Sequence, residues 1–186
     1  MGLGVVPPLW DQFDPDEIVD FHAARLLILL NECGAGAVSK RIDGRTKLVK
    51  LDFFLRYGHF LERAHQELVQ RGQIDSPYVA DVDKPEAPMI RYLFGPWDPR
   101  YRRFIAFLEA RGLVRVGGTK IERVSLTRVG KVHAERLANE ASFATIVARA
   151  RAMRGNMADW TGTQLKEFIY EVLQEEVADL ELGEEI

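Results

Sequence analysis

The strongest constraint on the fold is an ordered set of short elements in the second half of the chain. Residues 89–94 form a β-rich run that Gly95-Pro96-Trp97 should break, and a helix that ends at Gly112 follows. Two further β-rich runs flank Gly117-Gly118, a pattern that predicts a hairpin. Thr127 can then cap the next helix. Each signal is common, but a helix, a hairpin and a capped helix in this order are typical of a winged helix.

Apolar residues at helical spacing predict further helices on both sides of this segment. Asp14-Pro15 and Asp98-Pro99 carry the same start signal, a capping residue followed by a proline suited to the first turn. Thr46 can cap a second helix whose apolar stripe continues past Gly58, where a kink is expected. A capping-box pattern opens the last helix at Thr161.

These elements predict a mainly α protein with a small antiparallel sheet, built as a winged-helix core plus C-terminal helices. The 186 residues, 47% of them hydrophobic, suffice for one core of moderate size with appendages. We expect an N-terminal arm at 1–13, the winged-helix core at 14–139 with a loop insertion at 72–88, and a helical extension at 140–186. Within that extension, residues 140–155 carry alanines along one helical face.

The composition favours a cytoplasmic protein. The single cysteine, Cys33, cannot form an intramolecular disulfide and follows an apolar run, so we expect a buried thiol. The N-terminus lacks the basic and long apolar regions of a signal peptide, and no apolar stretch is long enough to span a bilayer. We therefore expect a reducing compartment and no membrane contact.

Charge is distributed unevenly along the chain, although the net charge is only −3. The segment 98–131 contains nine basic and three acidic residues, whereas 163–186 contains one lysine and eight acids. Because salt screens exposed charges beyond about 10 Å, local charge decides what each surface attracts. We expect the basic middle and the acidic tail to contact different partners.

Seven cations of the predicted helix and wing are candidates for contact with DNA phosphates or with an acidic partner surface. They are Arg100, Arg102, Arg103, Arg111, Arg115, Lys120 and Arg123. A solvated basic face is the plainer interpretation, since such faces are common on helices. Within this helix and wing, no Asn/Gln pair at helical spacing indicates readout of bases.

No pattern in the sequence favours catalysis, a cofactor or a metal. Glu62 and His65 are one turn apart, but a di-iron bundle needs a second such pair, so a surface carboxylate and imidazole are the simpler interpretation. Residues 34–40 contain loop glycines but follow a helix and lack the ending of a phosphate-binding loop. Zinc spacing and a nucleophile elbow are also absent from the sequence. We therefore expect a protein that is not an enzyme.

Three short segments carry a family resemblance. They are Arg45-Thr46-Lys47-Leu48-Val49-Lys50-Leu51-Asp52-Phe53-Phe54-Leu55, Gly95-Pro96-Trp97-Asp98-Pro99-Arg100-Tyr101 and Gly112-Leu113-Val114. Together they resemble the small middle components of ABC-three-component bacterial defence systems. That broad group includes Lamassu accessory subunits and looks like the winged-helix partners of condensin-type SMC complexes. In the order of its elements the resemblance covers roughly residues 15–175.

The resemblance implies a non-catalytic subunit that bridges an SMC-like or ABC-type ATPase to an effector, such as a nuclease, in anti-phage defence. A bridging subunit needs an apolar surface for its partner. The last predicted helix provides a candidate protein contact, the stripe of Phe168, Ile169, Val172 and Leu173 opposite acidic residues. The alternative is that this stripe packs on its own domain, which is the usual role of an amphipathic helix.

Two other functions stay open at this point. A winged-helix DNA-binding transcriptional regulator would use the basic helix and wing for DNA and the helices of residues 140–182 to dimerise. An antitoxin-like module would instead neutralise the product of a neighbouring gene. Tight binding to one operator distinguishes the regulator from an accessory subunit, which alone should bind DNA weakly and without sequence preference.

Overall fold

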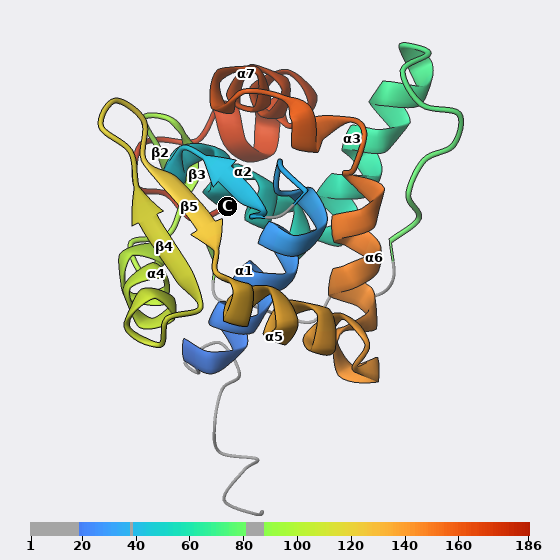
Figure 1. The fold of residues 1–186 in the computed structure, drawn as a ribbon. Helices are drawn as coiled ribbons and strands as arrows, with labels where there is room; N and C mark the ends of the chain where they lie inside the picture. The colour runs from blue at the N-terminus through green and yellow to red at the C-terminus, as the bar shows by residue number, and fades with distance from the viewer. Residues whose placement is uncertain (1–18, 38, 81–87) are drawn as a thin grey trace, which may run out of the picture.

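The computed structural model describes residues 19–37, 39–80 and 88–186, and it confirms a mainly helical fold with a small antiparallel sheet. The sheet has the strand order β1–β5–β4, and the hairpin of β4 and β5 is the predicted wing. Strand β1 pairs with β5, so the wing is tied to the N-terminal half of the chain (Figure 1). The bounds are Arg41–Asp43 for β1, Val114–Gly117 for β4 and Arg123–Leu126 for β5.

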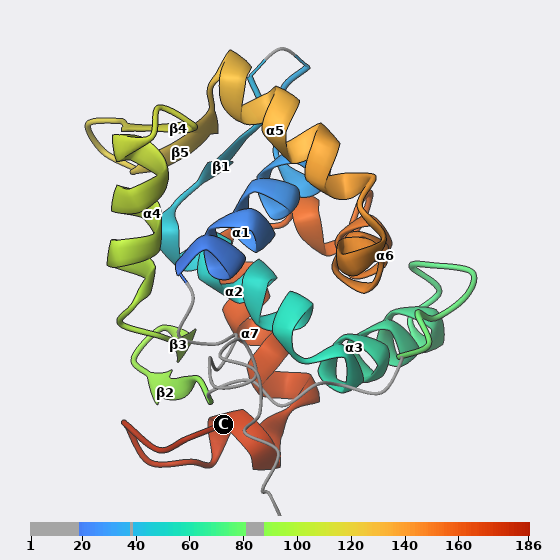
Figure 2. The same ribbon diagram turned by 90° about the horizontal axis from the view of Figure 1, so that it is seen from below.

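Helix α1 runs through the centre of the molecule, with α4, α5, α6 and the sheet arranged around it (Figure 2). A helix covered on every side must be apolar nearly all round, and residues 22–30 of α1 are all buried. The bounds are Val19–Cys33 for α1, Arg45–Arg56 for α2, Tyr101–Ala110 for α4 and Arg128–Ala138 for α5. The predicted arm and the predicted helix start at Asp14-Pro15 lie outside the described residues.

Cys33 ends α1 as the buried thiol that the sequence predicts. Its Sγ lies 3.3 Å from the carbonyl oxygen of Ala150, to which the thiol donates. Burial raises the pKa of this thiol to about 12, so the group stays protonated at neutral pH. The side chain therefore behaves as a small apolar residue between α1 and α6.

The second predicted helix is two helices, because α2 ends at Arg56 and α3 (Gly58–Gln70) begins after Tyr57. Arg149 of α6 lies at this break, and its Nη1 donates to the carbonyl oxygens of Leu55 at 2.8 Å and Arg56 at 3.2 Å. A Cβ at Gly58 would lie 2.5 Å from Nη2 of that guanidinium, so a larger residue there would have to displace the arginine. The predicted cap at Thr46 is also wrong, since α2 is preceded by Gly44 in a positive-φ conformation.

Gly95-Pro96-Trp97 does not break the predicted strand but forms its partner. Strands β2 (Ile90–Tyr92) and β3 (Gly95–Trp97) pair as a second antiparallel hairpin. Gly95 has φ 106°, which suits it to the tight turn between them. The acidic C-terminal tail lies along the free edge of β2, where the Arg91 nitrogen donates to the Glu184 oxygen at 2.8 Å (Figure 2).

The joint between α4, the wing and α5 follows the sequence prediction. Gly112 and Leu113 lead from α4 into β4, and the Thr127 side chain caps α5 by accepting from the Gly130 nitrogen at 2.9 Å. The Thr127 hydroxyl also donates to the Gly112 oxygen at 2.7 Å. A Cβ at Gly130 would lie 1.8 Å from the Leu113 oxygen, so the Thr-x-x-Gly sequence lets α5 start directly against β4.

The C-terminal helices share the core of the winged helix. Buried Val147 and Ala150 of α6 and Leu165 and Ile169 of α7 belong to the same apolar cluster as α1 and α2. The alanine face expected at 140–155 is largely solvent-exposed instead. The remaining bounds are Ala141–Phe143 for η3, Ala144–Ala152 for α6, Met157–Asp159 for η4, Gly162–Val172 for α7 and Gln174–Ala178 for η5. Within the described ranges, no helix has the length and apolar composition needed to cross a bilayer.

Candidate interaction surfaces

The outer face of the three-stranded sheet is basic. Val116 and Val124 point to the core, so Arg115 and Arg123 lie on the opposite face of the wing. Arg41 of β1 pairs with Ser125 and joins the same face, which makes it a cation that the sequence prediction missed. Asp43 offsets part of this charge, because its carboxylate lies 3.5 Å from Nε of Arg123. Lys120 is exposed in the loop that joins β4 to β5.

Helix α4 and the residues that flank it expose three of the predicted cations and draw one inward. Arg102 and Arg103 are both exposed. Arg100 instead binds the buried carboxylate of Asp98, with Nη2 to Oδ2 at 2.7 Å. Arg111, at the far end of the helix, stacks on the ring of Phe107 with its guanidinium carbon 4.4 Å from the ring centroid. Of the seven predicted cations, Arg100 is therefore the one whose charge is offset by a buried carboxylate.

The apolar stripe of α7 is not a free contact surface. Phe168, Ile169 and Leu173 are buried in the core, and Val172 is half-buried against it. The stripe covers α2, and the Thr161–Gln164 capping box at its start is formed as predicted. The interpretation of these four residues as a protein contact is thus wrong, and the alternative that they pack on their own domain is correct.

The charged residues of the family-like segments meet in the interior. Asp52 of α2 accepts both Nε and Nη2 of Arg25, at 2.8 and 2.9 Å, and it also accepts the hydroxyl of Tyr101. Burial, followed by the charge of Asp52, raises the pKa of Tyr101 well above its usual value. Arg56 of the same helix donates to Asp98 at 3.0 Å.

Asp98 is the second buried carboxylate of this network. Burial alone would raise its pKa, but hydrogen bonds from Arg100 and Arg56 lower the pKa of Asp98 to about 2. The arrangement therefore holds the end of β3 and the start of α4 onto α2. These are internal ties, since both carboxylates are nearly inaccessible to solvent.

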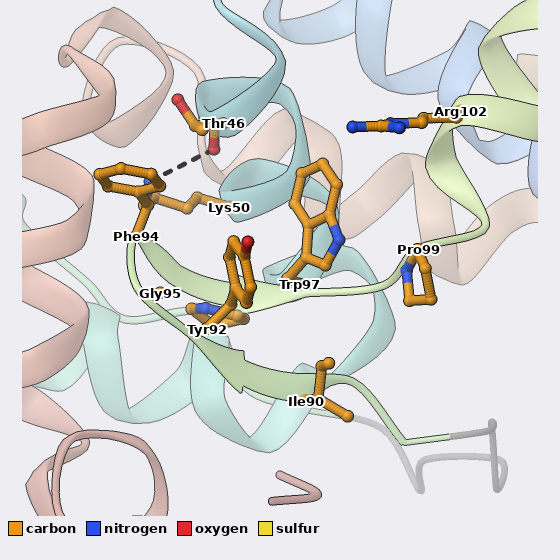
Figure 3. A pocket seen from close by; sticks show the side chains of 10 residues that line it. Thr46, Lys50, Ile90, Tyr92, Phe94, Gly95, Trp97, Pro99 and Arg102 are labelled. Carbon is orange, nitrogen blue, oxygen red and sulfur yellow. Dashed lines mark hydrogen bonds between the residues drawn. The ribbon is translucent and has the colours of Figure 1, made fainter. Parts of the chain in front are cut away.

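A hollow of about 470 Å³ lies between α2 and the β2–β3 hairpin (Figure 3). Its lining is Thr46, Lys50, Ile90, Tyr92, Phe94, Gly95, Pro96, Trp97, Pro99 and Arg102. Trp97 and Tyr92 stand next to each other in it, with ring centroids 6.2 Å apart, and Arg102 points toward Trp97 from α4. A second hollow adjoins the first, because Thr46, Lys50 and Phe94 line both.

Lys50 forms the floor of this hollow and is only 2% exposed. Its Nζ lies 3.4 Å from the backbone oxygen of Thr46 in its own helix. Burial, and secondly the charge of Lys166, lowers the pKa of Lys50 to about 8. Lys50 was not among the site residues predicted from the sequence. The available signal was that Lys50 and Asp52 are the only charges in the apolar run 48–55.

Exposed apolar side chains surround the two hollows. Tyr92, Leu93 and Phe94 are exposed at the tip of the β2–β3 hairpin, and Ile121 is exposed in the wing loop. Phe94 and Ile121 both line the second hollow, so the hairpin tip and the wing loop border one region. An apolar rim of this kind beside cations is typical of a binding surface.

His65 and Glu62 hold the loop that follows α3. His65 is 3% exposed, so the expected surface imidazole is wrong. Its Nδ1 accepts the Tyr78 nitrogen at 3.0 Å, while Glu62 accepts the Ala80 nitrogen at 3.3 Å. Burial lowers the pKa of His65 to about 4. Across the described part of the chain, no group of three or more His, Cys, Asp or Glu side chains is placed to hold a metal.

Comparison with protein-family models, with curated proteins and with solved structures found no match to this chain. The class of the protein is therefore defined by its fold, a winged helix with C-terminal helices. Its candidate sites are the basic outer sheet face, the exposed cations of α4 and the aromatic hollow above Lys50.

Proposed function

We propose that the chain is a non-catalytic, cytoplasmic winged-helix subunit that bridges an SMC-like or ABC-type ATPase to an effector in bacterial anti-phage defence. The proposal rests on the family resemblance of three segments. It is supported by where those segments lie in the fold.

The observation that carries the proposal is that two of these segments are joined by a buried hydrogen bond to a carboxylate. The segment at 45–55 supplies Asp52, and the segment at 95–101 supplies Tyr101, which donates to it. The first segment also reaches the wing, because Nε of Arg45 lies 2.9 Å from the carboxylate of Glu122. Residues from distant parts of the chain that interact in this way form one structural unit, and this supports the use of the three segments together as the basis of the proposal.

The distribution of surfaces also supports a bridging role. Cations cover the outer sheet face and the exposed side of α4, whereas apolar side chains border the hollows at the hairpin tip. The two regions differ in chemistry, and a bridging subunit needs two surfaces for two different macromolecules.

Co-purification tests the proposal. The full chain is expressed with a coiled-coil ATPase encoded beside its gene, and capture is repeated from low to high salt. We expect a complex, and we expect the double variant Arg102→Glu with Arg103→Glu to lower its salt resistance, because rim charges act mainly through salt-dependent attraction. Failure of the two proteins to associate at every salt concentration would overturn the proposal.

A matched double variant controls for the change in net charge. Arg128→Glu and Arg136→Glu alter two exposed positions of α5 by the same amount. Glutamate is favourable at the first residue of that helix and unfavourable in its last turn, so the two effects on stability offset each other. This control should leave the complex unchanged.

A DNA-binding regulator is the second candidate, favoured by the exposure of Arg102 and Arg103 on the helix that precedes the wing. A mobility-shift series at graded salt tests it. For DNA contact, the double variant with glutamate at both positions should reduce the salt slope by about two. Tight binding to a single operator, lost in this variant, would favour the regulator over the accessory subunit.

A further inference from the structure

The hollow above Lys50 contains a buried cation without a counterion in the described part of the chain. Arg25 and Arg56 are equally buried, but they donate to Asp52 and Asp98. The lining of the Lys50 hollow includes two cations and, among the residues described, no carboxylate. Because a buried charge without a partner is costly, the site favours an anion from outside the chain.

The surroundings of Lys50 add to this positive potential. Thr46 lies in the first turn of α2, where backbone N–H groups give the helix end a partial positive charge. Arg102 lines the rim, and Lys47 and Lys166 line the adjoining hollow. Two acids, Asp43 and Asp159, line that adjoining hollow and offset its lysines only in part.

The walls of the hollow are aromatic. Phe94 lies beside the end of Lys50, and Trp97 stands between Lys50 and Arg102, with Tyr92 next to it and Thr46 at the edge (Figure 3). Planar rings of a ligand stack well on such side chains, and most base–aromatic contacts are of this kind. The volume of about 470 Å³ is within the range of small-molecule sites.

We propose that this hollow binds a nucleoside phosphate, with the phosphate against Lys50 and the base against Trp97. The Lys50 cation, the Thr46 hydroxyl and the N-terminus of α2 suit a group with several charged oxygens, and Arg102 adds positive charge at the rim. The proposal stands apart from the accessory-subunit function, because the hollow would bind such a ligand with or without an ATPase partner.

Titration of the full chain with AMP, adenosine and inorganic phosphate tests the proposal. Binding is followed by tryptophan fluorescence and by calorimetry. We expect AMP to bind, and adenosine to bind at least about tenfold more weakly because it lacks the charged group. Inorganic phosphate should also bind more weakly than AMP, because it lacks the ring that stacks on Trp97.

Matched variants assign the signal to this hollow. Lys50→Met keeps an apolar stem in the floor and should weaken AMP by about tenfold or more. Lys166→Met removes a cation of the adjoining hollow and should weaken AMP by less than about threefold. Trp97→Phe should abolish the fluorescence change, while Trp160→Phe, which alters the second hollow, should keep it.

The pH dependence of affinity provides a readout that a merely structural role of Lys50 would not change. The charged groups around Lys50 are Arg102 of α4, Lys47 of α2 and Lys166 of α7, with Asp43 and Asp159 beyond. Because the pKa of Lys50 is about 8, AMP affinity should fall by about tenfold between pH 7 and pH 9. The Lys50→Met variant should lack this fall.

Three outcomes would overturn the proposal. The first is no binding of AMP at millimolar concentration, and the second is AMP affinity that is equal in the wild type and Lys50→Met. The third is inorganic phosphate or adenosine that binds as tightly as AMP, since either would leave half of the site without a role. Circular dichroism of each variant confirms that the compared chains are folded.

Discussion

Asp52 and Lys50 are two positions apart in α2, so they face opposite sides of the helix. Their charged groups have very different hydrogen-bond partners. Asp52 accepts two bonds from Arg25 and one from Tyr101. Lys50 has one long bond to a carbonyl of its own helix. Both side chains are almost fully buried, so the difference lies in partners rather than in exposure.

Asp52 has a structural role, whereas Lys50 is the residue that we propose binds a ligand. The network of Arg25 and Asp52 is complete within the fold, and its role is to hold α1, α2 and α4 in one arrangement. Lys50 has no counterion among the described residues that line its hollow, and its burial costs stability that a bound anion would restore. Four stability measurements test these assignments.

Removal of Asp52 should have the largest effect. Asp52→Ala removes the carboxylate that accepts two bonds from the buried guanidinium of Arg25, and we expect a loss of about 3–5 kcal/mol in the free energy of unfolding. Chemical denaturation measures it. Asp43→Ala is the control, since its half-exposed carboxylate should be worth less than about 1 kcal/mol. Equal losses in the two variants would contradict the structural role of the network.

His65 is a third kind of buried group, one that is kept neutral. Its pKa of about 4 in the folded chain is below the usual 6.5, so the unfolded chain binds the proton first as pH falls. Stability should therefore decline between about pH 6.5 and pH 4, by about 3 kcal/mol in total. In His65→Gln, which keeps an acceptor for the Tyr78 nitrogen, this decline should be smaller. A parallel decline in both chains would count against the assignment.

Lys50→Met should raise stability, in contrast to Asp52→Ala. The folded pKa of Lys50 is depressed to about 8 from 10.5, so the cost of charging it is present at pH 7 and disappears as pH rises through that interval. We expect a gain of about 2 kcal/mol at pH 7 that shrinks toward pH 10.5. Denaturation at several pH values measures it, with exposed Lys120→Met as the unchanged control. A destabilised Lys50→Met would show that the lysine has a partner within the chain.

Tyr101→Phe should have the smallest effect. It removes one donor to Asp52, but the two bonds from Arg25 stay in place. We expect a loss of about 1 kcal/mol, well below that of Asp52→Ala. A loss as large as that of Asp52→Ala would mean that the hydroxyl, rather than the ion pair, holds α4 on α2.

The sequence predicted those parts of the fold that depend on neighbours along the chain. The wing hairpin forms with its loop at 118–122, directly after Gly117, Thr127 caps α5, and Thr161 and Gln164 form the capping box of α7. In each case the residue and its partner are within a few positions of each other. An interruption at Gly58 was expected, but only as a kink; that the helix divides in two, with Arg149 bonded to the carbonyl oxygens at the break, was not predicted because Arg149 is distant in sequence.

The candidate sites were predicted less well for the same reason. Arg102, Arg103, Arg115, Lys120 and Arg123 are exposed as charge patterning suggested, but Arg100 is drawn into the interior by Asp98. Phe168 and Ile169 form an amphipathic stripe in either interpretation, and periodicity alone does not say which surface covers them. The hollow at Lys50 was not predicted, because it forms where the β2–β3 hairpin lies beside α2.

Most helical segments, the wing hairpin and the division of charge could be predicted from the sequence, because periodicity, caps and turn residues act over a few positions. Tertiary structure alone decided which charges are paired, which apolar stripe is covered and where a hollow remains. Those outcomes depend on side chains brought together from distant parts of the chain, and burial changes the free energy of a charge far more than any local preference does.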